Sequence, residues 1–149
     1  MIDIIPYEPA HAYAILERNV RERNLWLSSY PDWEMWVKGW KDGGPAYTLI
    51  IDGEIVMSAG VVLMDWNRGE AWTLFTTLLD KYPLTAIKQI KKYLEMIVVR
   101  NRLKRLQALI DPEYKPGVKF IEFLGFENEG RLRAYGPKNE DYLMFSRIY

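Results

Sequence analysis

The sequence contains no cysteine and only one histidine among its 149 residues. Without cysteine, the chain can form no disulfide and offers neither thiolate ligands for zinc nor a cysteine nucleophile. With His11 as its single histidine, a Ser-His-Asp triad and a histidine-based metal site are not expected, so we predict no metal centre. The absence of cysteine also fits a cytoplasmic protein.

Neither an excess of charge of one sign nor a long apolar run is present. The 20 Lys and Arg residues balance 20 Asp and Glu residues, so we expect neither nucleic acid nor a membrane surface as a partner. A basic group, Lys88, Lys91 and Lys92, is interpreted as the solvated face of a helix. The longest nearly apolar stretch, 55–64, is too short to span a bilayer. The first residues lack the pattern of a signal peptide, so no leader is expected.

Aromatic residues are abundant in an otherwise ordinary composition. They make up 14% of the chain and include six tryptophans, whereas the hydrophobic and charged fractions, 49% and 27%, are typical of a globular protein. The length is typical of one domain, so we expect residues 1–149 to form a single unit with a sizeable core.

Hydrophobic periodicity predicts an alternation of strands and helices. We expect strands at 2–6, 46–52, 54–64, 70–79, 106–110, 126–135 and 142–148. We expect helices at 9–18, 31–41 and 83–102 and a short helix capped by Gly125, whereas 20–29 is ambiguous. The long helix acts as a crossover between parallel strands, and the short turns elsewhere imply hairpins. The predicted fold class is therefore α/β (α+β), with a mixed, mostly antiparallel sheet of about seven strands, helices on both faces and the order β-α-α-β-β-β-α-β-α-β-β.

The segment 120–130 has the sequence FIEFLGFENEG, in which a short helix closes with Leu-Gly-Phe and a strand follows. Together with the element order, this segment resembles the GNAT N-acetyltransferase superfamily. The resemblance covers nearly the whole chain in element order and is specific in its residues only over 120–130. It implies acetyl-CoA-dependent transfer of an acetyl group to an amine, carried by a small molecule or a protein, with a homodimer as one assembly to expect. Some small members are encoded by phages, which would place the chain in the host cytoplasm.

The resemblance also implies where acetyl-CoA binds. In the family, the third long strand separates from the strand after the main helix, so the backbone of Leu78 and Leu79 would align the pantetheine arm. Lys81 and the helix start at Thr85 and Ala86 would hold the pyrophosphate, because a helix N-terminus presents free N–H groups. Thr85 would also cap this helix.

The pyrophosphate loop departs from the family pattern, Arg/Gln-x-x-Gly-x-Gly/Ala. Here 81–86 is KYPLTA, with Leu84 where glycine is usual and with Pro83 removing a backbone donor. An alternative hypothesis follows: the chain is a catalytically degenerate GNAT-fold binding or assembly protein, for example a phage protein, with weak or no acetyl-CoA binding.

Two residues are candidates for catalysis. The resemblance implies that Glu70 is the general base, because a protonated amine must lose a proton before it attacks a thioester. The alternative is that Glu70 is a solvated turn residue. Ile121 stands where the family usually has a tyrosine acid, so Tyr114 is the candidate in its place if its hydroxyl points into the cleft. The segment 111–113, Asp-Pro-Glu, is interpreted as a turn.

Trp33, Trp36 and Trp40 are spaced i, i+3 and i+7, so they share one face of the second helix. We expect at least one of them to pack on the sheet. The resemblance places the acceptor beside this helix and the last two strands, which makes Trp33, Trp36 and Tyr142 the substrate-binding candidates. Aromatic rings at that place could contact an ammonium group by cation–π interaction.

Four further aromatic residues are assigned by position alone. Trp26 and Tyr30 lie just before the second helix and would extend the acceptor wall. Trp66 and Trp72 are assigned to packing.

Overall fold

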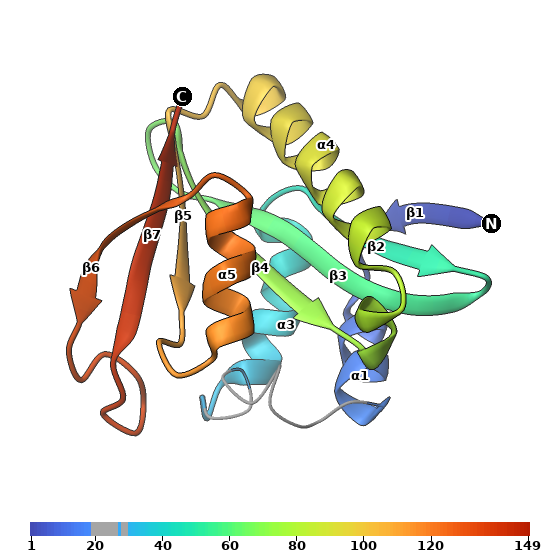
Figure 1. The fold of residues 1–149 in the computed structure, drawn as a ribbon, viewed down its shortest axis with the longest axis horizontal. Coiled ribbons are helices and arrows are strands. Elements are labelled where there is room, and N and C mark those ends of the chain that lie inside the picture. Colours follow the sequence, from blue (N-terminus) through green and yellow to red (C-terminus); the bar gives the residue numbers. More distant parts are fainter. Residues whose placement is uncertain (19–26, 28–29) are drawn as a thin grey trace.

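The structure is a computed structural model that describes residues 1–18, 27 and 30–149. Trp26 and nearly all of the ambiguous segment 20–29 lie outside the described residues. The elements, shown in Figure 1, are β1 (Ile2–Pro6), α1 (Pro9–Arg18), α3 (Trp33–Gly43), β2 (Ala46–Ile51), β3 (Glu54–Leu63), β4 (Arg68–Phe75), the 3-10 helix η1 (Thr77–Asp80), α4 (Pro83–Asn101), β5 (Arg105–Ile110), α5 (Lys115–Phe123), β6 (Glu127–Leu132) and β7 (Tyr142–Ile148).

The strands form one seven-stranded sheet in the order β1-β2-β3-β4-β5-β7-β6. Each neighbouring pair is antiparallel except β4 and β5. This parallel pair is the one that α4 connects, as a crossover helix requires. The predicted fold class is therefore confirmed.

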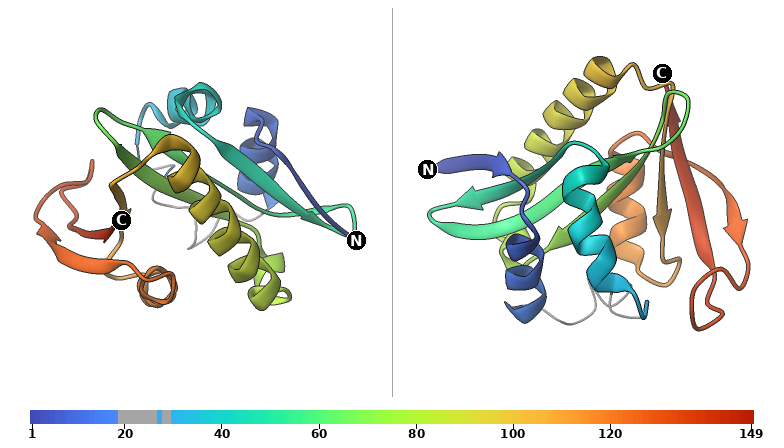
Figure 2. Two further views of the ribbon diagram at one scale, coloured as in Figure 1. Left: turned by 90° about the horizontal axis from the view of Figure 1, so that it is seen from above. Right: turned by 180° about the vertical axis from the view of Figure 1, so that it is seen from behind.

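Helices cover both faces of the sheet (Figure 2). On one face, α1 and α3 bury apolar residues against β4, including Ile15, Val37 and Leu74. On the other face, α4 and α5 bury residues such as Ile90 and Ile121 against the rest of the sheet. The core is thus divided by the sheet into two layers, and any opening in the sheet lies between them.

The predicted cap of the short helix is confirmed at Gly125, which has a φ of +89°. The Gly125 N–H donates to the carbonyl of Glu122, and the Phe126 N–H donates to the carbonyl of Ile121. This pair of bonds is the Schellman arrangement, in which a residue without a Cβ is favoured at the left-handed position. The motif turns the chain into β6 and buries Phe126.

The strand predicted at 70–79 ends earlier than expected, so the predicted C-terminal boundary is wrong. β4 stops at Phe75, and Leu78 and Leu79 lie in η1. The Thr76 side chain accepts a hydrogen bond from the Leu78 N–H and so caps η1. A threonine hydroxyl that satisfies a free N–H at a helix start favours the helical turn over a longer strand.

Two other expectations are corrected. Thr85 does not cap α4: the cap residue is Tyr82, and α4 begins at Pro83, whose fixed φ suits the first helical position. The strand expected at 126–135 ends at Leu132, and the chain turns before Tyr142.

Candidate active site

The parallel strands β4 and β5 separate soon after they meet. They pair at Arg68 with Arg105, at Gly69 with Leu106 and at Glu70 with Gln107. Beyond that last pair, residues 71–75 stay with β3 and residues 108–110 stay with β7. Figure 1 shows β4 and β5 diverging, and we call the opening between residues 71–75 and 108–110 the wedge.

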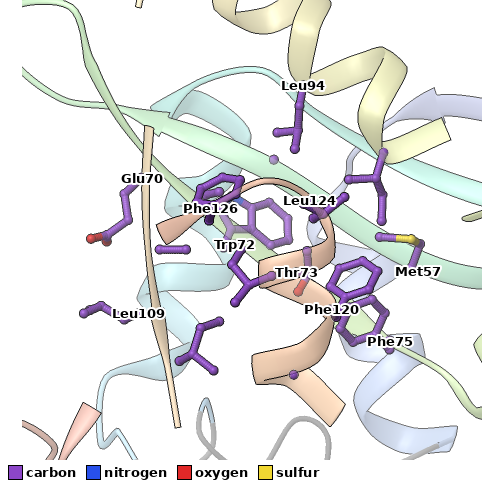
Figure 3. Close-up of a pocket in the computed structure, with 18 of the residues that line it drawn as sticks. Met57, Glu70, Trp72, Thr73, Phe75, Leu94, Leu109, Phe120, Leu124 and Phe126 are labelled. Carbon is purple, nitrogen blue, oxygen red and sulfur yellow. The ribbon is translucent and has the colours of Figure 1, made fainter. Parts of the chain in front are cut away.

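A cavity of about 800 Å³ occupies the wedge. Residues of α3, β4, β5 and α5 line it, some of which are drawn in Figure 3. From α5 these include Gly117, Phe120 and Ile121, which lie on one face of the helix, and Tyr114 lines the cavity just before the helix begins. The cavity therefore joins the two helical layers through the sheet.

The charged side chains on the cavity wall are all acidic. Within the described part of the chain, the charged residues that line the cavity are Glu70, Asp111 and Glu113, and no lysine, arginine or histidine lines it. The Glu113 N–H donates to Asp111 Oδ1 at 2.9 Å, which confirms the predicted turn at 111–113. The wall thus favours a positively charged occupant.

Glu70 lies at the narrow end of the wedge. It is half-buried within β4, and Gln107 Nε2 donates a hydrogen bond of 3.1 Å to Glu70 Oε1. Because side chains alternate along a strand, Glu70 and Trp72 point to the same face, the one covered by α3. Glu70 is thus a strand residue at the cavity and not a solvated turn residue.

The backbone of Thr73, three residues beyond Glu70 on β4, faces the wedge. Hydrogen bonds at Arg68 and Thr76 show that the even-numbered residues of β4 exchange bonds with β3. In an antiparallel pair the residues between them point their N–H and C=O groups the other way. The N–H and C=O of Thr73 therefore point towards the wedge, beyond the last pair with β5.

The predicted aromatic wall is present in part. Trp36 lines the cavity and packs on Tyr30, with ring centroids 4.4 Å apart. Tyr142, also at the cavity, is buried and shares a side-chain hydrogen bond with Tyr30. Burial raises the pKa of both hydroxyls, so both tyrosines are neutral at physiological pH.

The other tryptophans that the structure describes are Trp33, Trp40, Trp66 and Trp72, of which Trp40 and Trp72 also line the cavity. Trp33 is not among the cavity residues and packs edge-on against Tyr13. Trp40 is buried and stacks on Trp72, which confirms that part of this helical face is core. Trp66 was assigned to packing, but it is 88% exposed in the turn between β3 and β4, so that assignment is wrong. A turn residue outside both layers has no apolar surface to pack on.

Tyr114 lies where a hydroxyl can reach the cavity. It immediately precedes α5, is half-buried and lines the cavity. Its ring lies against Gly117, where a Cβ would come within 2.6 Å of the ring. Ile121, at the usual tyrosine position, is a buried residue of the core.

The residues expected to hold acetyl-CoA are not among those that line the cavity. These are Leu78, Leu79, Lys81, Thr85 and Ala86, whereas the next turn of α4 reaches the cavity through Gln89 and Ile90. Lys81 is exposed, and its ammonium lies 5.3 Å from the centre of the Tyr82 ring. Ala86 is fully buried, and its N–H donates to the Tyr82 carbonyl.

The start of α4 is poor in backbone donors. Pro83 has no N–H, and the Ala86 N–H is already used. The first turn therefore offers at most the N–H groups of Leu84 and Thr85 to an anion.

Sequence reasoning missed Gln107 and Thr73. Gln107 had a detectable signal, because it is the one polar residue within the apolar stretch 106–110. Thr73 had none, because the direction of a peptide group depends on strand register.

The described residues contain neither a metal-binding cluster nor a membrane-spanning helix. No three His, Asp or Glu side chains of that part of the chain lie close enough together to hold a metal ion. No helix among the described residues is long and apolar enough to cross a membrane.

Comparison with known proteins adds information at the level of the fold. No protein-family model and no curated protein sequence matches the chain. Solved structures do match. An acetyltransferase of the GNAT family from Streptococcus pneumoniae superposes with a TM-score of 0.72 at 15% identity, over 99% of both chains.

Two further structures agree with this match. The ribosomal-protein-S5-alanine acetyltransferase from Vibrio fischeri gives a TM-score of 0.70 at 15% identity, over 99% of this chain and 92% of that one. A variant of the spermidine N-acetyltransferase from Vibrio cholerae gives a TM-score of 0.73 at 12% identity, over 99% of this chain and 93% of that one. The chain therefore has the GNAT fold, as the resemblance of 120–130 predicted.

Proposed function

We propose that this protein is an acetyl-CoA-dependent N-acetyltransferase that transfers an acetyl group directly to an amine. The observation that carries the proposal is the cavity in the wedge, with a carboxylate at its narrow end and acidic residues on its wall. The GNAT fold and the acetyltransferases that share it support the same activity.

Glu70 is the proposed general base. An ammonium group in the acidic cavity gives a proton to Glu70, directly or through one water, and the neutral amine then attacks the thioester carbonyl. The N–C bond forms and the C–S bond breaks. Tyr114 is proposed to give its hydroxyl proton to the departing thiolate, because it lines the same cavity. The attacking nitrogen loses its second proton as the amide forms, and this proton restores the Tyr114 hydroxyl.

Acetyl-CoA supplies the acetyl group as a thioester, and the wedge is the proposed site of the pantetheine arm of this cosubstrate. The Thr73 N–H and C=O face the wedge and could pair with the arm as a strand would. The role given to Leu78 and Leu79 assumed that β4 extended that far, so we assign the aligning backbone to Thr73 instead. Lys81 and the N–H groups of Leu84 and Thr85 are proposed to hold the pyrophosphate.

The proposed acceptor is a primary amine that is cationic at neutral pH, on a small molecule or a protein. Glu70, Asp111 and Glu113 attract the ammonium, and the rings of Trp36 and Tyr142 offer an apolar and cation–π wall. A cytoplasmic location, where acetyl-CoA is available, belongs to this proposal.

One observation favours a second candidate function. The first turn of α4 has one backbone donor fewer than usual, because Pro83 has no N–H. A GNAT-fold protein with such a loop could have lost acetyl-CoA binding and kept the scaffold for binding or assembly.

Thermal unfolding with acetyl-CoA separates the two functions. Ligand at about 100 times its dissociation constant stabilises a protein by ~2.7 kcal/mol. For a chain of this size, the Tm would rise by roughly 5–10 °C. We expect this rise with acetyl-CoA and turnover with cationic amines such as diamines or lysine-containing peptides. No change in Tm at millimolar acetyl-CoA would contradict the enzyme and favour the binding protein.

A further inference from the structure

Four polar side chains form a continuous chain of hydrogen bonds that starts at Glu70. Gln107 Nε2 donates to Glu70 Oε1 at 3.1 Å, and Arg105 Nε donates to Gln107 Oε1 at 3.0 Å. The Arg105 guanidinium then donates two hydrogen bonds to the Glu129 carboxylate. Nη1 donates to Oε2 at 2.9 Å, and Nη2 donates to Oε1. The chain of bonds runs from β4 through β5 to β6.

The orientation of the Gln107 amide is determined by this chain of bonds. A guanidinium nitrogen can only donate, so Gln107 must present its oxygen to Arg105. Its NH₂ group is then directed at Glu70. Gln107 is only 8% exposed, which leaves little room for another side-chain conformation.

Arg105 is itself held in place from the far side of β7. The ion pair with Arg105 and a hydrogen bond from Ser146 lower the pKa of Glu129 to about 2. Glu129 therefore stays ionised throughout the neutral range, and the two-point contact with Arg105 persists.

We infer that Gln107 is a positioning residue for the general base, held by Arg105 and Glu129. This inference rests on the proposed function, because it assigns a partner to the proposed base. The Gln107 amide binds one oxygen of Glu70 and so holds the carboxylate at the last pair of β4 and β5. The second oxygen is then available to take a proton from the ammonium or from a water.

Ionisable groups approach Glu70 from several elements, and Asp111, Glu113, Tyr114, Tyr135 and Tyr142 line the same cavity. The Tyr30 hydroxyl interacts with it electrostatically from the chain before α3, and the Arg105 guanidinium lies behind Gln107 on β5. On β3 the paired residue is Val62, which carries no charge. A change of charge at 107 would act on Glu70 from hydrogen-bond distance, because Gln107 Nε2 lies 3.1 Å from Glu70 Oε1.

The test compares two substitutions at 107. Gln107→Glu can still accept from Arg105 Nε but places a carboxylate beside Glu70, and like charges oppose each other's ionisation. Gln107→Leu removes the donor without adding charge. We expect kcat to fall about 10- to 100-fold in both variants, as for a misplaced catalytic group. The acidic limb of the kcat/KM profile should move to higher pH in Gln107→Glu.

Three controls make the result specific. Both variants should keep the Tm rise with acetyl-CoA, which shows that they fold and bind the cosubstrate. Glu70→Gln should lose at least as much kcat as either variant. Asp65→Asn, which breaks an exposed ion pair with Arg68 at 2.7 Å in the β3–β4 turn, should leave kcat and the pH profile unchanged.

Two outcomes would overturn the inference in distinguishable ways. If wild type and Glu70→Gln behave as proposed but the Gln107 variants keep the wild-type kcat and pH profile, Gln107 does not position the base. If the wild-type protein acetylates no amine, the proposed function fails and the inference fails with it.

Discussion

The indole ring of Trp40 lies flat on the indole ring of Trp72, with centroids 4.0 Å apart and an angle of 10° between the planes. This stack joins α3 to β4, and Tyr7 reinforces the junction by donating from its hydroxyl to the Val37 carbonyl at 2.8 Å. One turn earlier on the same helical face, Trp36 is half-buried and lines the cavity. Both tryptophans line the cavity, but Trp40 is buried in the stack with Trp72 whereas Trp36 is half-buried.

Replacing these two tryptophans should separate stability from function. Trp40→Ala should lower the free energy of unfolding by about 3–5 kcal/mol, because it leaves a cavity in a buried stack. Trp36→Ala should cost about 1 kcal/mol of stability and raise KM for a cationic amine about fivefold. Urea unfolding and steady-state kinetics measure the two effects. An equal loss of stability in both variants would contradict the assignment of Trp40 to the core and of Trp36 to amine binding.

Thr73→Pro should weaken acetyl-CoA binding about tenfold, the loss of about one hydrogen bond. Proline removes the N–H that faces the wedge and leaves the bonds between β4 and β3 intact, because those use the even-numbered residues. Thr73→Ala keeps the N–H and is the matched control. Isothermal titration with acetyl-CoA distinguishes them, and equal affinities of the two variants would rule out a role for this peptide group.

Tyr114→Phe should lower kcat about 100-fold with little change in KM, because it removes the proposed acid but keeps the ring against Gly117. Tyr13→Phe, remote from the cavity beside Trp33, is the control and should keep wild-type activity. The measurement is kcat at saturating acetyl-CoA. Wild-type kcat in Tyr114→Phe would show that another group protonates the thiolate.

His11 should make folding stability depend on pH. Its Nδ1 accepts a hydrogen bond from the Glu8 N–H at 3.0 Å and lies 2.8 Å from Thr48 Oγ1. Burial lowers the pKa of His11 below its ordinary value of 6.5, so the folded state binds this proton less readily than the unfolded chain does.

The contribution of neutral His11 to folding stability is therefore fully present above about pH 6.5. It is lost as the pH falls through the lowered pKa of His11. We expect the free energy of unfolding to decrease between about pH 7 and pH 5 in the wild type. The free energy of unfolding of the His11→Gln variant should decrease less over the same pH interval, as measured by urea unfolding at each pH. Parallel curves for the two proteins would contradict this prediction.

The sequence alone predicted the fold, because its signals are local. Apolar spacing marks each helix, the turn at Asp52 and Gly53 marks a hairpin, and the Leu-Gly-Phe at 124–126 marks the helix end that the structure shows. Glu70, Tyr114, Trp36 and Tyr142 were also selected from the sequence, and the structure places all four at one cavity.

The tertiary structure decided what depends on register and on the third dimension. At the end of β4 the Thr76 hydroxyl is held by the carbonyls of Ile55 and Val56 on β3, and the direction of the Thr73 backbone groups follows from the pairing with β3. The contact between Gln107 and Glu70 joins residues 37 positions apart. Periodicity shows which face a side chain occupies, but only the pairing of strands decides which residue lies opposite it.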